Sequence, residues 1–273
     1  MLKQRVISAL VLALVVVGAI FHPDPLWVRL LFGLILFAAM MELTRLTVSR
    51  SRLVQALLAT AMAVLFLLSH AQFDSQMIRY HAYVGLVAWC LVLLLLFRYR
   101  FSGHWSPAVN GLVFAFSALL IWVCINSLLF VHGQSAHGPW ILIYILTLVW
   151  VADIGAYFAG RRFGRHKLAP GISPGKTWEG VFGGIALNAL WISLVFALSR
   201  GWGMDYPVFL LLGLATSAIS VVGDLYESIL KREAGMKDSG RLLPGHGGVL
   251  DRIDSVIAAA PVYLSGLFLA GAL

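Results

Sequence analysis

Nine long apolar segments occupy most of this 273-residue chain and limit what it can fold into. A bilayer core about 30 Å thick takes roughly 20 apolar residues as a helix, and backbone inside lipid must satisfy its own hydrogen bonds. With 60% hydrophobic and 12% charged residues, the chain is too apolar for a soluble domain. We therefore predict an all-α, polytopic integral membrane protein with about nine transmembrane helices. The expected spans are Val6–Phe21, Leu26–Leu43, Leu53–Ser69, Tyr83–Phe97, Ala108–Val131, Trp140–Ala159, Trp178–Leu198, Tyr206–Leu230 and Ile253–Leu273.

Basic residues are distributed unevenly between the two sides that these helices would separate. If the N-terminus is cytoplasmic, nearly all of the 20 Lys and Arg residues fall on the inner side. Such a bias is the positive-inside rule, and it accounts for the net charge of +8 without a nucleic-acid partner. Lys3 and Arg5 precede the first apolar run, which no small-residue cleavage site follows, so we expect a retained helix rather than a signal peptide.

Residues able to do chemistry concentrate in the second half of the chain. We predict one continuous membrane domain, in which residues 1–150 form N-terminal transmembrane scaffold helices and residues 151–273 carry the site. In the first part ionisable residues are few, and none is expected in the middle of a span except Arg29. Counting helices puts the loops 160–177 and 231–252 on the same, cytoplasmic side.

The segment Ser173–Gly180, SPGKTWEG, precedes the seventh expected span. It is not a P-loop, because Pro170 stands where that motif needs glycine and no strand precedes it. We expect Ser173 to cap a helix whose first residue is Pro174. Backbone N–H groups at a helix start favour an anion, and Lys176 would add a charge. The alternative is that Lys176 only marks the inner interface.

Spacings of three and four place Asp224, Glu227, Ser228 and Lys231 on one face of the eighth span. Asp224 follows a long apolar run and should lie at or below the membrane boundary, where ionisable groups are costly and usually functional. A Mg²⁺ ion would offset its charge and attract phosphate oxygens. The alternative is an Asp224–Lys231 or Glu227–Lys231 ion pair that only ties helices together.

Asp251 and Asp254 share a face at the start of the ninth span, directly after a glycine-rich segment. The glycines allow the backbone to approach a ligand closely, and His246 among them could contact phosphate or assist proton transfer. The alternative for the two aspartates is a favourable interaction with the helix dipole alone. Asp153, in the sixth span, either completes the polar pocket or pairs with an arginine of the pair Arg161–Arg162.

From Ser228 to Asp254 the residue spacing resembles the signature of the phosphatidate cytidylyltransferase (CDP-diacylglycerol synthase) family. The matching residues are Ser228, Lys231, Arg232, Lys237, Asp238, Pro244, His246, Gly247, Gly248, Asp251, Arg252 and Asp254. We see no departure from the pattern over these 27 residues. Ser173–Gly180 and Gly223–Glu227 also resemble family segments, whereas the first 150 residues resemble the family only in hydropathy.

The resemblance implies a nucleotidyltransferase of phospholipid biosynthesis that moves the cytidylyl group of CTP to phosphatidic acid, giving CDP-diacylglycerol and pyrophosphate. It also implies Mg²⁺ dependence, with a second cation left open, a homodimer, and an inner-membrane location with the active site facing the cytoplasm. One alternative is a CTP-dependent lipid-alcohol kinase. A cation-coupled transporter fits less well, because such sites usually lie near the bilayer midplane, between repeated halves.

With this resemblance, we expect the phosphatidate oxygen to attack CTP directly, without a covalent enzyme intermediate. Asp224 and Asp251 are expected to hold the metal, with Asp254 or Asp238 close by. The expected metal ligands are Asp224, Asp251 and Asp254. The expected catalytic residues are Asp224, Lys231, Lys237, His246, Asp251 and Asp254. The expected substrate-binding residues are Ser173, Lys176, Thr177, Glu179, Glu227, Ser228, Arg232, Asp238, Gly247, Gly248 and Arg252.

Overall fold

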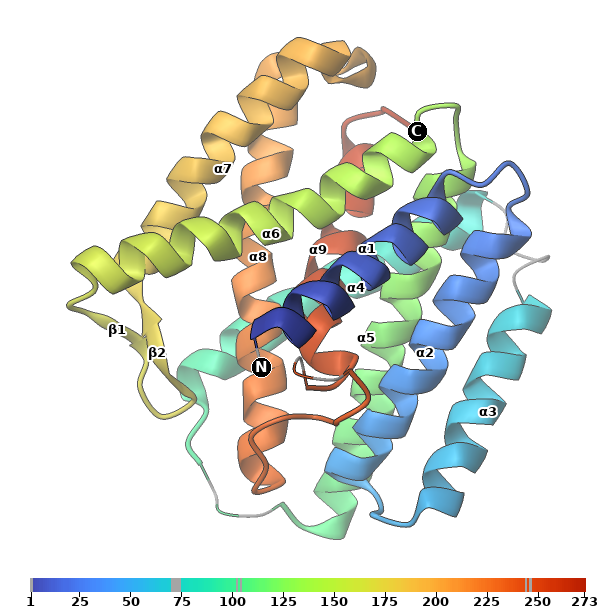
Figure 1. Ribbon diagram of the computed structural model, residues 1–273, viewed down its shortest axis with the longest axis vertical. Helices are drawn as coiled ribbons and strands as arrows, with labels where there is room; N and C mark the ends of the chain where they lie inside the picture. Colours follow the sequence, from blue (N-terminus) through green and yellow to red (C-terminus); the bar gives the residue numbers. More distant parts are fainter. Residues whose placement is uncertain (1, 70–74, 102, 104, 244, 246) are drawn as a thin grey trace.

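The structure, a computed structural model, describes residues 2–69, 75–101, 103, 105–243, 245 and 247–273. Within these residues the chain forms long α-helices and one small two-stranded sheet (Figure 1). The helices are α1 (Leu2–Ile20), α2 (Leu26–Thr47), α3 (Arg52–Ser69), α4 (Ser75–Arg98), α5 (Pro107–Gly133), α6 (Gly138–Phe163), α7 (Trp178–Ser199), α8 (Tyr206–Glu233) and α9 (Leu250–Leu269).

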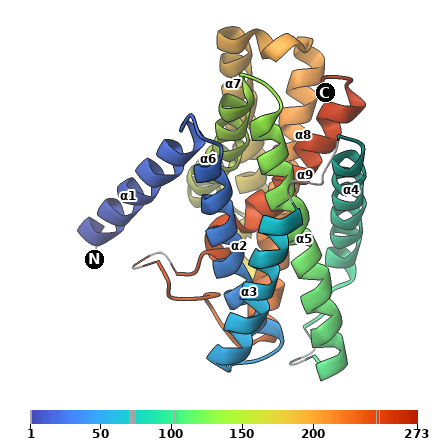
Figure 2. The ribbon, with the colours of Figure 1, turned by 90° about the vertical axis from the view of Figure 1, so that its right-hand side faces the viewer.

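Eight of the helices that the structure describes are long and apolar enough to cross a membrane, namely α2 to α9. The prediction of an all-α polytopic membrane protein is confirmed. In α1 the described apolar part, Val11–Ile20, is shorter, and Figure 2 shows α1 extending away from the bundle. The count of about nine spans and the cytoplasmic N-terminus stay predictions.

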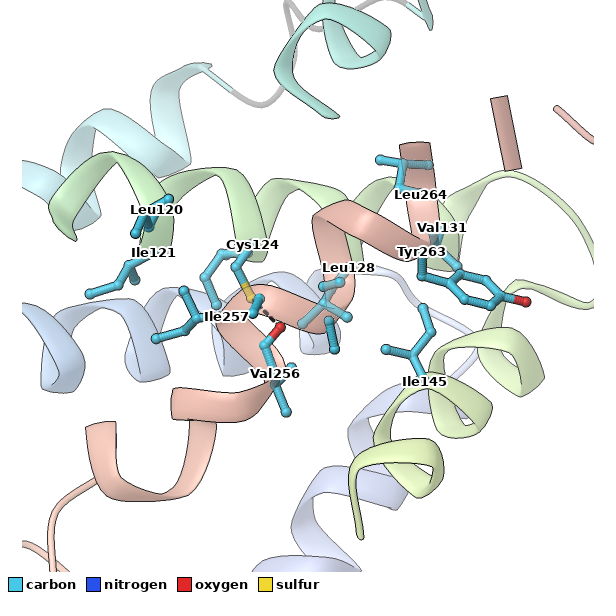
Figure 3. Close-up of a cluster of buried hydrophobic side chains, with 14 of the residues drawn as sticks. Leu120, Ile121, Cys124, Leu128, Val131, Ile145, Val256, Ile257, Tyr263 and Leu264 are labelled. Atoms are coloured by element: carbon cyan, nitrogen blue, oxygen red, sulfur yellow. Dashed lines mark hydrogen bonds between the residues drawn. The ribbon is translucent and has the colours of Figure 1, made fainter. Parts of the chain in front are cut away.

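The last helix, α9, lies at the centre of the fold and packs against α8, α5, α4 and α6. Its middle part, Ser255–Ser265, is buried, and Figure 3 shows it packed between α5 and α6. There the thiol of Cys124 in α5 donates to the carbonyl of Val256 at 3.5 Å. The N-terminal end of α9, which carries Asp251 and Asp254, is therefore fixed by a large apolar core.

Helices α8 and α9 approach each other closely beside the expected site. A Cβ added at Gly223 would lie 2.4 Å from the backbone oxygen of Asp254, so only glycine fits there without a shift of the backbone. This contact places Asp224, the next residue of α8, near the carboxylate of Asp254 on α9. The two aspartates interact electrostatically as a result.

Between α6 and α7 the chain forms an antiparallel hairpin of β1 (Lys167–Ala169) and β2 (Ser173–Thr177). The prediction that Ser173 caps a helix beginning at Pro174 is therefore wrong. Thr177 caps α7, and its Oγ1 accepts the backbone N–H of Gly180 at 3.1 Å. The reason is local, because Gly175 is a poor residue for a first helical turn and strand pairing satisfies backbone groups of this segment instead.

Candidate functional site

The expected site residues meet where the hairpin, the C-terminal end of α8 and the start of α9 come together. Lys176 Nζ of β2 lies 2.5 Å from Asp224 Oδ2 of α8. Arg232 Nε, also in α8, donates to the backbone oxygen of Ile172 in the hairpin at 3.2 Å. These contacts confirm that the loops 160–177 and 231–252 lie on the same face of the molecule.

Lys231 links α8 to α9 through two carboxylates. It forms an ion pair with Glu227, one turn earlier in α8, and its Nζ lies 2.7 Å from Asp251 Oδ1 in α9. The side chains of Glu227, Lys231 and Asp251 are only 3%, 14% and 8% exposed. The Glu227–Lys231 pair that was the structural alternative is thus present, but the same lysine also reaches the next helix. Buried charges need such pairing, because removing one partner leaves an uncompensated charge.

Asp251 fastens the loop between α8 and α9 to the start of α9. Its Oδ2 accepts hydrogen bonds from Ser239 N (3.0 Å), Ser239 Oγ (2.9 Å) and Gly248 N (2.8 Å), while Oδ1 faces Lys231. Protein donors therefore already surround both oxygens. The expected metal-ligand role of Asp251 stays a prediction. To bind a metal ion, Asp251 would have to give up one of these hydrogen bonds or its contact with Lys231.

Asp224 and Asp254 are less fully paired. Asp224 is 28% exposed and accepts from Ser228 Oγ at 3.3 Å in addition to its contact with Lys176. Asp254 interacts electrostatically with Asp224 and with Glu227, which gathers negative charge between the two helices. Carboxylates that repel one another in this way favour a cation between them.

Asp224 and Asp254 carry the oxygen ligands that a magnesium ion prefers. The described part of the chain holds no cluster of three or more His, Cys, Asp or Glu side chains that could bind a metal without help. Mg²⁺, however, is commonly held by one or two carboxylates, with water and substrate phosphates completing its shell. Asp224 and Asp254 would supply that minimal set if Asp224 gave up its contact with Lys176, which would then be available to phosphate.

A cavity of about 380 Å³ lies between α6, α7, α8 and β2. Lys176, Asp153 and Arg161 contribute polar groups, and most of the remaining wall is small or apolar. Asp153 also interacts electrostatically with Asp224, Lys176 and Arg252. Of its two predicted roles, the structure favours completion of the polar pocket, since the guanidinium of Arg161 donates instead to the hydroxyl of Tyr157 at 3.0 Å.

Two expected substrate-binding residues instead hold the hairpin and α7 together. Thr177 caps α7, as described above. The carboxylate of Glu179 accepts the backbone N–H groups of Arg165 (3.1 Å) and His166 (3.2 Å) and contacts His166 Nδ1 at 2.6 Å. Both residues therefore help to position Lys176, and Thr177 also lines the cavity.

The remaining expected residues lie around the same face. Arg232, Lys237, Asp238 and Arg252 are exposed, Ser173 is partly exposed in β2, and Ser228 is buried. Gly247 has a positive φ of 84° and pairs with Leu243 in an isolated bridge, while Gly248 is buried against Ser239. His246 lies outside the described residues, so its predicted role is untested.

Sequence reasoning missed Glu42 of α2, which is 7% exposed and lies against the loop that carries Ser239. The expectation that residues 1–150 act only as a scaffold does not account for this contact. One feature of the sequence could have pointed to Glu42 as a functional residue, because it is an acidic residue at the end of an expected apolar span. Its partners lie about two hundred residues later in the chain, so no local pattern points to them.

Known proteins resemble this chain over most of its length. The sequence model of the family described as "Cytidylyltransferase family" matches residues 3–269. The chain is 41% identical over 280 residues to the phosphatidate cytidylyltransferase of Haemophilus influenzae, covering 96% of this chain and 97% of the relative. It is 40% identical over 274 residues to that of Pseudomonas aeruginosa (99% and 98% covered). It is 31% identical over 280 residues to that of Bacillus subtilis (98% of each chain).

Proposed function

This chain belongs to the cytidylyltransferase family, and we propose that the site between α8, α9 and the hairpin transfers the cytidylyl group of CTP to phosphatidic acid. The products are CDP-diacylglycerol and pyrophosphate. One observation supports this assignment above the others, namely the meeting of Lys176 and Lys231 with the carboxylates of Asp224, Asp251 and Asp254 at one end of the helices. A reaction between two phosphate anions needs this combination of positive charge and metal-binding oxygens.

The reaction is an in-line displacement at the α-phosphorus of CTP. A phosphate oxygen of phosphatidate forms the new P–O bond, and the bond from the α-phosphorus to the bridging oxygen breaks, so that pyrophosphate leaves with the electron pair. Catalysis of such transfers is mostly positioning and charge neutralisation. Lys231 and Lys176 neutralise the approaching phosphates, and no covalent enzyme intermediate is required.

Asp224 and Asp254 are the residues that would hold Mg²⁺. When bound, the ion would neutralise charge on the triphosphate and orient the α-phosphate for attack. Asp251 takes a different part in this proposal, because it holds Lys231 and the loop at Ser239 in place. The second cation expected from the family resemblance stays a prediction.

The cavity beside Lys176 is suited to the lipid substrate. Its apolar wall residues, Val181, Ile185 and Val221 among them, come from α7 and α8, which have the composition of membrane spans. A phosphatidate headgroup at Lys176 and Arg161 could therefore keep its acyl chains among apolar side chains. CTP, which carries several charges, would approach from the exposed side, where Lys237, Arg232 and Arg252 lie.

A radiolabel on the α-phosphate of CTP tests the reaction. We expect the label in the chloroform-soluble lipid product, with unlabelled pyrophosphate released, because the α-phosphate moves with cytidine. The control carries the label on the γ-phosphate, which should stay in the aqueous phase. A CTP-dependent lipid-alcohol kinase would give the reverse result, with the γ-label in lipid and the α-label in CDP.

The site is expected to face the cytoplasm from the inner membrane, where CTP is available. Lys237→Cys should react with a membrane-impermeant maleimide in inverted vesicles and stay unlabelled in right-side-out vesicles, because Lys237 is exposed next to the site. The unchanged chain, with Cys90 and Cys124 within spans, is the control. Labelling only in right-side-out vesicles would contradict this orientation. The homodimer implied by the family resemblance also stays a proposal.

A further inference from the structure

We propose that Glu42, in the N-terminal half of the chain, is a positioning residue for the transfer site. The inference rests on the proposed function. It extends the site to a part of the chain outside the residues 228–254 that carry the family resemblance. Glu42 is 7% exposed and lies in α2, a helix composed mostly of apolar residues. A charged side chain in such a place is costly unless its hydrogen bonds are satisfied, and it usually has a function.

Glu42 caps the start of α9. Its Oε1 accepts the backbone N–H of Val249 at 3.0 Å, and its Oε2 accepts that of Leu250 at 2.8 Å. Val249 is the N-cap residue of α9 and supplies no side-chain hydrogen bond of its own. A helix start leaves N–H groups unsatisfied and attracts negative charge, so the distant carboxylate does what a local Ser or Asp does at other helices.

The same carboxylate is linked to Asp251 through one serine. Ser239 is fully buried, and its Oγ lies 2.8 Å from Glu42 Oε2 and 2.9 Å from Asp251 Oδ2. Asp251 in turn binds Lys231. A continuous series of contacts therefore runs from α2 through the loop to Lys231, the lysine proposed to neutralise substrate phosphate, although Glu42 itself does not line the cavity beside Lys176.

Two glycines of the loop leave space for this carboxylate. A Cβ at Gly240 would lie 2.1 Å from Glu42 Oε1, and a Cβ at Gly248 would lie 2.3 Å from Glu42 Oε2. Neither glycine has a positive φ, so close approach to Glu42, and at Gly248 also to Ser239, explains why a side chain is excluded. The loop is thus shaped around the side chain from α2.

The test replaces Glu42 in the full-length chain reconstituted in lipid. Glu42→Gln keeps the size but turns one acceptor into a donor facing backbone N–H groups, so we expect kcat to fall about tenfold or more, with KM for phosphatidate within about twofold of wild type. Trypsin cleavage after the exposed residues Lys237 and Arg241 should become faster, because the loop loses its anchor. Glu42→Asp retains the charge and should recover part of kcat. If Glu42→Gln does not fold, kcat and loop cleavage are measured on Glu42→Asp instead.

Thr44→Val is the matched control. Thr44 is fully buried in the same helix, and its hydroxyl donates within α2 to the carbonyl of Met40 at 2.7 Å. We expect wild-type kcat and wild-type cleavage from this variant. A double-mutant cycle gives a second measurement, since Gly240→Ala should slow turnover alone but have little further effect in a Glu42→Ala background.

The outcomes separate this inference from the proposed reaction. Cleavage of the loop does not depend on which phosphate is transferred, so faster cleavage in both Glu42 variants supports the inference even if the radiolabel shows a kinase. Unchanged cleavage in both variants overturns the inference, whatever their activity. Strict additivity in the Gly240 cycle would also contradict it, because the two side chains would then not share a contact.

Discussion

Replacing Lys231 by methionine is expected to abolish cytidylyl transfer and to destabilise the folded protein. The ammonium group lies between Glu227 and Asp251, which are 3% and 8% exposed. Without it, two buried carboxylates face each other unpaired, and breaking a buried ion pair in this way costs about 3–5 kcal/mol. Turnover should fall on the order of a thousandfold, because the lysine is also proposed to neutralise charge that develops in the transition state. Thermal unfolding in detergent and turnover of the α-labelled nucleotide measure the two effects.

A second substitution separates these two consequences of losing Lys231. Adding Glu227→Gln to Lys231→Met removes one of the two unpaired charges and should recover part of the thermal stability. Activity should stay lost, because no cation replaces the ammonium group. If Lys231→Met alone unfolds at the wild-type temperature, the buried ion-pair network does not contribute to stability as argued. If it turns over at the wild-type rate, Lys231 has no catalytic role.

Local periodicity predicted correctly which polar residues share one face of α8. The face formed by Asp224, Glu227, Ser228 and Lys231 follows from the helical repeat alone, and the contacts between these side chains confirm it. The meeting of two loops on one side followed from counting helices, which needs only the spans between them to be right. The hydrogen bond from Arg232 Nε to the backbone oxygen of Ile172 bears this out.

Contacts between distant segments could not be predicted in this way. Nothing near Glu42 in sequence indicates that its partners are Ser239, Val249 and Leu250, since those contacts depend on how α2 packs beside α9. The hairpin before α7 was missed for a different reason. Its strands have three and five residues, too few for an alternating pattern, and its stability comes from the contacts of Glu179 and the cap at Thr177.

Asp254→Asn is expected to lower turnover on the order of a thousandfold while leaving the protein as stable as wild type or more so. Asparagine keeps the shape and the oxygen that accepts the Ser255 N–H, seen here at 2.6 Å. The change removes one buried negative charge, which Asp224 and Glu227 repel and which Lys231 and Lys176 attract. Burial and the repulsion by Asp224 are the larger effects, so the folded state should not lose stability. Activity falls because one of the two carboxylates proposed for Mg²⁺ is gone.

Asp254→Asn is expected to lower activity without lowering stability, and this combination distinguishes a metal ligand from a residue that only holds the fold. A residue that only held the fold would lose stability and activity together, whereas a metal ligand in an acidic cluster loses activity alone. Residual turnover should need a higher Mg²⁺ concentration for half its maximum than the wild type does. Asp224→Asn should also raise the Mg²⁺ requirement, since it removes the other proposed ligand, but it breaks the ion pair with Lys176 and should cost stability as well. Wild-type turnover with an unchanged Mg²⁺ requirement in Asp254→Asn would remove Asp254 from the metal site and leave Asp224 without its proposed partner.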